Sequence, residues 1–137
     1  MLDLSGAEYY RLPLLLMAYQ HTSQGSLERP TPEQDQLLWQ LGGDFYEDYA
    51  AGKLNMPQLV NLGLAWKGST GLLGWQGVRA SLDPRIRGPL AYVLGHRYRR
   101  LGKPEDSATF FREARDDAQP GSPLQRLIAA ETERRDR

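Results

Sequence analysis

Apolar residues recur at intervals of three and four along most of the chain, which is the spacing of one face of an α-helix. Several of the expected helices start with a capping box, in which a Ser or Thr and a Glu or Gln three residues later bond each other's backbone amides. Such boxes begin at Ser5, Thr31 and Ser122. The pattern predicts helices near residues 5–20, 31–50, 57–67, 89–101, 104–118 and 122–134. We therefore expect an all-α fold of antiparallel helical hairpins, in one domain that covers residues 1–137.

The expected helix at 31–50 is apolar on two faces. One face carries Leu37, Leu38, Leu41, Phe45 and Tyr49, and the other carries Trp39, Gly43, Tyr46 and Ala50. A helix that is apolar over so wide an arc normally has neighbours on both sides. We expect the helix at 57–67 to pair with it, and a second copy of the chain to cover the remaining face as a homodimer. The alternative cover is the first helix, through Leu15 and Met17, which would leave a monomer.

Residues 68–77 read GSTGLLGWQG, with glycine at every third position. Glycine costs a helix roughly 1 kcal/mol relative to alanine, so we expect a Gly-rich structural connector over residues 68–88. Two alternatives stay open. One is a short, closely packed helix with a glycine face, and the other is a ligand cradle, which lacks the lysine and Ser/Thr of a phosphate-binding loop. The connector would separate N-terminal helices at 1–67 from a C-terminal part at 89–137.

The most regular stretch, residues 89–118, predicts two amphipathic helices joined by a tight corner. Gly102 can take the left-handed conformation that ends a helix, and Pro104 suits the first turn of the next. Gly95 has no side chain, so a facing helix can approach it closely. The apolar stripes are Ala91, Leu94, Tyr98 and Leu101 in the first helix, and Ser107, Phe110, Phe111, Ala114 and Ala118 in the second.

This stretch resembles a tetratricopeptide (TPR) repeat, in which Leu-Gly, Tyr, Gly, a small residue, an aromatic residue, Ala and Pro follow in that order. The matching positions are Leu94, Gly95, Tyr98, Gly102, Ser107, Phe111, Ala114 and Pro120. Ala91 stands where the family often has Trp, and the proline comes one residue late. The resemblance implies a TPR-like helical array, closed at residues 122–134 by a capping helix with a polar outer side.

The resemblance also implies a kind of function, because TPR proteins bind other proteins in a concave groove lined by the first helix of each repeat. Tyr92, His96 and Arg99 match groove positions, and Arg97 and Arg100 are their basic neighbours. We therefore expect a protein-protein interaction module, an adaptor or scaffold, that binds a peptide segment or partner helix there. The family's lysine and asparagine pair for a terminal carboxylate is missing, which argues against a clamp for a chaperone tail.

The net charge of zero hides a segregation of charge along the chain. Residues 1–50 carry −6, residues 51–104 carry +8, and the remainder carries −2. We expect these segments to neutralise one another in the fold. The alternative is that residues 79–103 bind an acidic partner, nucleic acid or another polyanion, although no nucleic-acid reader motif accompanies them. The cations of that segment are Arg79, Arg85, Arg87, Arg97, Arg99, Arg100 and Lys103.

Residues suited to catalysis or metal binding are few. The chain has no cysteine, and its two histidines, His21 and His96, lie far apart in sequence. No metal-ligand cluster and no nucleophile–base spacing can be assembled, so we expect neither an enzyme nor a bound metal or cofactor. The longest apolar run, residues 12–19, is too short to span a bilayer, and no signal peptide is visible. These features favour a cytoplasmic protein without a membrane partner.

Overall fold

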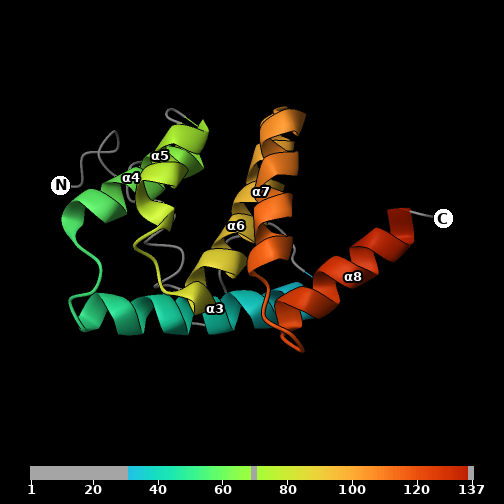
Figure 1. Ribbon diagram of the computed structural model, residues 1–137, viewed down its shortest axis with the longest axis horizontal. Coiled ribbons are helices and arrows are strands. Elements are labelled where there is room, and N and C mark those ends of the chain that lie inside the picture. Colours follow the sequence, from blue (N-terminus) through green and yellow to red (C-terminus); the bar gives the residue numbers. More distant parts are fainter. Residues whose placement is uncertain (1–30, 69–70, 136–137) are drawn as a thin grey trace.

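The computed structural model describes residues 31–68 and 71–135, and every regular element in that part of the chain is a helix (Figure 1). The helices are α3 (Pro32–Ala50), α4 (Met56–Lys67), α5 (Gly71–Arg79), α6 (Pro84–Arg100), α7 (Pro104–Asp117) and α8 (Pro123–Arg135). The prediction of an all-α fold is confirmed. The helix expected at residues 5–20 lies outside the described residues.

Capping boxes set the first turns of α3 and α4. Thr31 accepts a hydrogen bond from the backbone amide of Gln34, and the Gln34 side chain accepts one from the amide of Thr31. Asn55 and Gln58 form the same reciprocal pair before α4, in a box that begins with Asn rather than Ser or Thr. Each box satisfies amides that the first helical turn leaves without partners, so these boundaries are decided locally.

The prediction of a connector over residues 68–88 is wrong, because this stretch contains α5 and the start of α6. Glycine disfavours an isolated helix, but α5 buries Trp75 and Val78 completely. Burial of such side chains stabilises the fold by about 2 kcal/mol each, which offsets glycine penalties of roughly 1 kcal/mol each. Gly74 is itself buried. The stretch is the short helix of the first alternative, but its glycines do not form a packed face, because Gly77 is exposed and an added Cβ there would meet nothing within 4 Å.

The helix α6 begins at Pro84 rather than Pro89, and Pro89 lies inside it. Asp83 caps its start by accepting a hydrogen bond of 3.0 Å from the backbone amide of Arg85. Pro89 removes one backbone hydrogen bond from the helix. Ile86 and Leu90, on either side of the proline, are fully buried. Tertiary packing therefore stabilises a helix that continues past Pro89, a residue that would otherwise end it.

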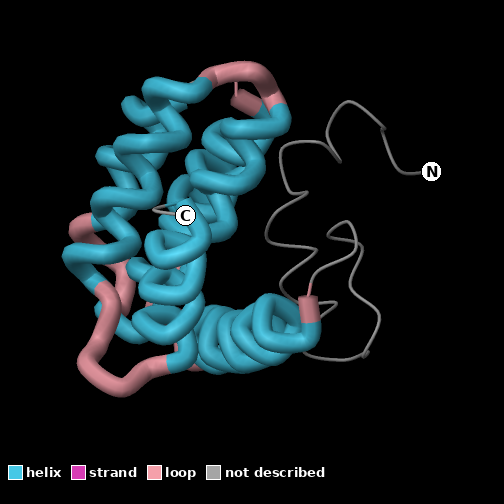
Figure 2. The backbone as a smooth tube through the Cα atoms, turned by 90° about the vertical axis from the view of Figure 1, so that its right-hand side faces the viewer, coloured by secondary structure: helices cyan, strands magenta, loops and turns pink. Residues whose placement is uncertain are grey.

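The central helix of the described part is α6 (Figure 1). It packs most extensively along α7 and also contacts α3, α4 and α8. Figure 2 shows the described helices from the side, with loops and turns joining them. The prediction that the helix at 57–67 pairs with the helix at 31–50 is wrong, because α4 packs mainly on α5. In Figure 1, α3 runs across one end of the α6–α7 hairpin. The last helix, α8, packs on α3 and α6.

Aromatic rings form the centre of the core. Phe110 lies 5.8 Å from Trp75 and 4.9 Å from Tyr98 between ring centroids, and all three side chains are fully buried. The Tyr98 hydroxyl donates a hydrogen bond to the backbone carbonyl of Ala65 in α4. Burial raises the pKa of Tyr98 to about 12, and the negative charge of Asp106 adds to the rise. These contacts join the α6–α7 hairpin to α4 and α5.

Gly95 lies at a close crossing of α6 and α7. A Cβ atom at this position would lie 2.8 Å from Cε1 of Phe111, well inside the distance at which carbon atoms pack. The Gly95 carbonyl also accepts a hydrogen bond of 2.8 Å from the buried hydroxyl of Ser107. The expectation that a facing helix approaches Gly95 closely is confirmed.

Ion pairs join the basic middle of the chain to acidic residues on both sides of it. Arg85 in α6 lies 2.7 Å from the buried carboxylate of Asp48 and 3.4 Å from that of Asp44, both in α3. Burial raises the pKa of the Asp44 carboxyl, although Arg85 acts in the opposite direction. Arg79 in α5 lies 3.2 Å from Glu113 in α7. The prediction that the charged segments neutralise one another is confirmed for these arginines.

Candidate functional site

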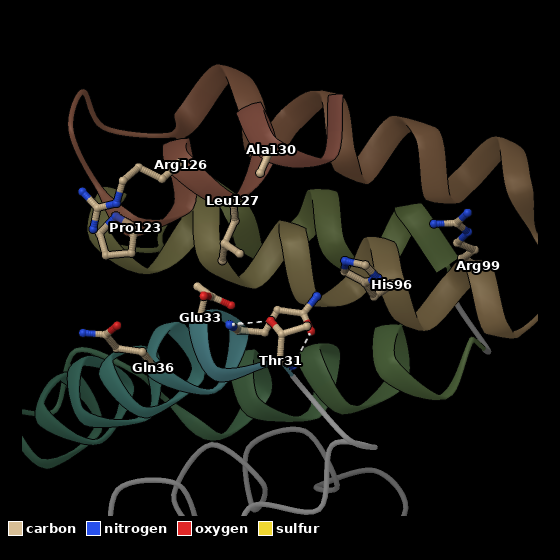
Figure 3. A pocket seen from close by; sticks show the side chains of 10 residues that line it. Thr31, Glu33, Gln36, His96, Arg99, Pro123, Arg126, Leu127 and Ala130 are labelled. Atoms are coloured by element: carbon tan, nitrogen blue, oxygen red, sulfur yellow. Dashed lines mark hydrogen bonds between the residues drawn. The ribbon is translucent and has the colours of Figure 1, made fainter. Parts of the chain in front are cut away.

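A groove opens between the start of α3, the second half of α6 and the start of α8 (Figure 3). Its volume is about 740 Å³, against about 100 Å³ for a second cavity between the same helices. Pockets of several hundred Å³ are the usual size for ligand sites. The lining residues are Thr31, Glu33, Gln34, Gln36, His96, Arg99, Pro123, Arg126, Leu127 and Ala130. We call this feature the α3–α6–α8 groove.

The wall from α8 is largely apolar. Pro123, Leu127 and Ala130 line it, and in Figure 3 the Leu127 side chain points from α8 towards α3. On the opposite side, the capping box of Thr31 and Gln34 forms the edge of the groove, with its amides and side chains already bonded to each other. A ligand therefore meets an apolar wall on one side and a rigid polar edge on the other.

The charged groups of the groove are two guanidinium groups and one carboxylate. Arg126 donates a hydrogen bond of 2.9 Å to the backbone carbonyl of Gly121. Arg99 is exposed, and no residue in the described ranges forms a hydrogen bond or an ion pair with its guanidinium. Glu33 lies in the first turn of α3, where the helix dipole favours a carboxylate. Because the Arg99 guanidinium has no partner within the described residues, it can pair with an acidic group on a ligand.

Tyr92, one of the predicted binding residues, is buried. Its side chain is 2% exposed, and its hydroxyl accepts a hydrogen bond of 3.0 Å from Nε2 of Gln34. At this position the face of α6 opposite Leu94 is covered, because Gln34 of α3 and Phe111 of α7 contact the Tyr92 side chain. Tyr92 thus lies beneath the groove, where it fixes Gln34, and is not placed to contact a ligand.

His96 packs beside two aromatic rings and reaches the groove. Its ring centroid is 4.7 Å from that of Tyr92 and 5.0 Å from that of Phe111, both in edge-on geometry. The side chain is half-buried, and in Figure 3 it lies on α6 beside the groove. Because packing already fixes this ring, it loses little conformational freedom when a ligand binds.

The other two predicted binding residues, Arg97 and Arg100, lie in the last turn of α6 but do not line the groove. The Arg97 guanidinium lies 4.7 Å from the centroid of the Trp66 ring, and its Nε donates a hydrogen bond of 3.0 Å to the Trp66 carbonyl. Arg97 therefore joins α6 to α4. Arg100 is exposed but does not line the groove. The structure thus brings His96 and Arg99 together in the groove, and places Tyr92, Arg97 and Arg100 elsewhere.

The groove residues of α3 and α8 are absent from the sequence prediction. Leu127 and Ala130 are recognisable in the sequence only as inward-facing residues of a last helix, and Gln36 only as a polar position. The capping box at Thr31 indicates where a helix starts. It does not indicate which residues pack beside that helix. No local signal shows that these residues meet α6, because that contact depends on how the helices pack.

Neither a metal-binding cluster nor a membrane-spanning helix is present in the described ranges. Within residues 31–68 and 71–135, no group of three or more His, Asp or Glu side chains is placed to hold a metal ion. The helices of that part are also too short or too polar to cross a membrane. A cytoplasmic location and the absence of catalytic activity stay predictions.

Comparison with known proteins gives no match for this chain: no family model, no curated protein and no solved structure is significantly similar to it. The α3–α6–α8 groove is therefore interpreted from its own geometry and chemistry.

Proposed function

We propose that this chain is a TPR-like protein-interaction module that binds a peptide segment or a partner helix in the α3–α6–α8 groove. One observation carries the proposal. His96 and Arg99, which the repeat resemblance assigns to a partner-binding face, line one groove together with the apolar Leu127 and Ala130. Apolar contacts beside an arginine are typical of surfaces that bind proteins. An adaptor or scaffold role follows from such binding.

The chemistry of the groove favours a partner segment that carries both apolar and acidic side chains. An apolar side chain of the partner would contact Leu127 and Ala130 on the α8 wall. A carboxylate nearby would pair with the Arg99 guanidinium, which has no partner to be displaced within the described residues. Since the groove holds two arginines and one glutamate, a basic segment would bind less well.

Binding of nucleic acid or another polyanion through residues 79–103 has less support. Arg79 and Arg87 lie within 3.3 Å of the Asp117 carboxylate, and Arg85 lies 2.7 Å from that of Asp48. A phosphate backbone would have to compete with these carboxylates. Polyanion binding depends on several cations that are available to release counterions, and the fold engages much of the basic segment internally.

Selection from a displayed library of random peptides, followed by titration of the selected peptides, tests the proposal. We expect peptides that combine acidic and apolar residues. Arg99→Glu should weaken their binding about tenfold or more, which corresponds to 1.4 kcal/mol, and Ala130→Arg should weaken it by filling the groove. Arg112→Glu is the matched control, because it makes the same charge change at an exposed position of α7. Equal losses in Arg99→Glu and Arg112→Glu, or no selected peptide, would contradict the proposal.

A further inference from the structure

Two arginines lie at opposite ends of the α3–α6–α8 groove (Figure 3). Arg126 lies near the start of α8, and this end of α8 packs on α6 at Gly88. There the Leu124 side chain lies 3.0 Å from the position that a Cβ atom on Gly88 would take. Arg99 lies in the last turn of α6. Since residues 88 and 99 are about 16 Å apart at the rise of an α-helix, roughly the same distance separates the two ends of the groove.

Both guanidinium groups retain donors for an anionic group of a ligand. That of Arg99 has no partner within the described residues. Arg126 donates through Nη1 to the Gly121 carbonyl, but a guanidinium has further N–H donors in the same plane. A carboxylate at either end of the groove would therefore gain a charge-assisted hydrogen bond.

The middle of the groove has a different chemistry. In Figure 3, Leu127 and Ala130 lie between the two arginines and supply apolar side chains. Glu33 also lies between them, and its carboxylate would repel an acidic group placed there. The groove thus favours an anionic group at each end of a ligand and an apolar group in its middle.

We propose that the groove binds an extended segment of about five residues from another protein, with an acidic residue at each end and an apolar residue at its centre. This inference rests on the proposed function and adds the conformation of the bound segment and the spacing of its side chains. Side chains alternate along an extended chain, so those of the first, third and fifth residues point the same way. The two acids then lie about 13 Å apart along the backbone, and the long side chains of glutamate and arginine cover the remaining distance.

The volume of the groove agrees with an extended segment rather than a helix. A helix with its side chains is about 10–12 Å across, so about 16 Å of it occupies about 1,300 Å³ or more. An extended segment takes about 5 Å by 10 Å in cross-section, which gives about 800 Å³ over the same length. The groove measures about 740 Å³. It therefore holds the full width of an extended segment but only part of a helix.

The spacing of the two acids distinguishes the two conformations. In a helix, residues four positions apart lie only about 6 Å from each other. A helical segment with acids at its first and fifth positions would therefore reach one of Arg99 and Arg126, but not both. A helix would need acids about eleven positions apart to cover the length of the groove.

Titration of the full chain with two synthetic peptides, followed by heteronuclear NMR, tests the inference. The first peptide is acetyl-Glu-Thr-Leu-Thr-Glu-amide, in which threonine favours an extended backbone and the blocked ends carry no charge. The second, acetyl-Glu-Glu-Leu-Thr-Thr-amide, has the same composition with both acids at one end. The spaced peptide should bind about tenfold more tightly, because only its acids reach both arginines. Equal affinities would overturn the inference.

Substitution of each arginine tests the same contacts from the side of the chain. Arg99→Glu and Arg126→Gln should each weaken binding of the spaced peptide about tenfold. The glutamine amide can still donate to the Gly121 carbonyl, and circular dichroism should show that both variants keep the helical content of the parent chain. Arg112→Glu, at an exposed position of α7, is the control and should leave the affinity unchanged. A loss in only one of the two groove variants would contradict contacts at both ends.

A charge exchange determines the direction of the bound segment. In the Arg99→Glu chain, a spaced peptide with lysine in place of one terminal glutamate should regain affinity, and lysine in place of the other should not. The glutamate whose replacement restores binding is the one that pairs with Arg99. Restoration by both peptides, or by neither, would overturn the proposed arrangement.

A third peptide separates failure of this inference from failure of the proposed function. It is helical and carries glutamates about eleven positions apart. Tighter binding of this peptide through Arg99 and Arg126 would overturn the extended conformation and leave the proposed function intact. The same holds if none of the three peptides binds at millimolar concentration while the random library still yields peptides that depend on Arg99. Failure of the library as well would contradict the proposed function itself.

Discussion

The helices α6 and α3 have similar lengths, 17 and 19 residues, but are stabilised differently. Residues 90–95 of α6 are all buried, whereas Trp39 and Tyr49 of α3 are 44% and 42% exposed. The main neighbour of α6 is α7, which follows it in the chain. Within the described residues, the helices that pack on α3 are α6 and α8, which come much later in the sequence; one such contact is the hydrogen bond from Gln34 to Tyr92. The α6–α7 hairpin is thus a local unit, and the position of α3, with the groove, depends on the whole fold.

The largest expected difference between the two regions comes from truncating an aromatic residue in each. Phe110→Ala in α7 should lower the free energy of unfolding by about 3–5 kcal/mol, because it leaves a cavity between Trp75 and Tyr98. Trp39→Ala in α3 should cost less, since its side chain is 44% exposed. Urea denaturation measures both. Equal decreases in the free energy of unfolding in the two variants would show that α3 is as tightly packed as the hairpin.

The next effect is a dependence of stability on pH that arises in the hairpin. The pKa of Tyr98 is about 12 in the fold and about 10 in an unfolded chain. Because the folded pKa is the higher one, this stabilisation is fully present below pH 10 and is lost as the pH rises through 12. It amounts to about 3 kcal/mol at most. Denaturation between pH 9 and 12 should show a slope that is reduced in Tyr98→Phe, and an identical slope in that variant would contradict the assignment.

A smaller effect separates two glycines that receive the same substitution. Gly95→Ala should lower the free energy of unfolding by about 1–3 kcal/mol, because the new Cβ would meet the Phe111 ring. At Gly77 in α5 an added Cβ would meet nothing within 4 Å. Gly77→Ala should therefore stabilise the chain by about 0.5–1 kcal/mol, the usual gain from removing a glycine from a helix. Thermal denaturation measures both, and the same sign of change at the two positions would contradict the packing described here.

The smallest expected effect on stability is that of Arg99→Glu in the groove. The side chain is exposed and is not paired within the described residues, so the free energy of unfolding should change by no more than about 0.5 kcal/mol. The contrast with Arg85 is informative, because Arg85→Ala would leave the buried Asp48 carboxylate without its closest cation. A large decrease in the free energy of unfolding of Arg99→Glu would mean that Arg99 stabilises the fold and is not available to bind a ligand.

Much of the fold is predictable from short-range signals. Thr31 and Gln34 start α3, Gly102 with φ 77° ends α6, and Gly95 marks a helix crossing. Each of these features needs only a few neighbouring residues, because caps and turns form within one segment. The main errors concern the stretch that includes α5 and the start of α6. There Gly74 and Pro89 argue against a helix locally, but burial of neighbouring side chains outweighs them.

Only the α6 side of the groove is predictable in the same way. His96 and Arg99 follow from the TPR-like pattern of α6 and its angular spacing. Tyr92 falls on the same face of the helical wheel and yet is buried, because Gln34 comes to lie against it from 58 positions away in the sequence. A helical wheel shows the direction in which a side chain points. It does not show which other helix will pack against that side chain.

The sequence by itself determined the all-α class, most helix boundaries and the close α6–α7 crossing, since these depend on hydrogen bonds and side-chain periodicity within short segments. The tertiary structure alone decided that α4 pairs with α5, that Arg97 packs on Trp66, and that α3 and α8 enclose a groove with His96 and Arg99. Those outcomes depend on which apolar faces meet after the helices have formed. Hydrophobic burial is non-directional, so only the complete set of competing faces selects the partners.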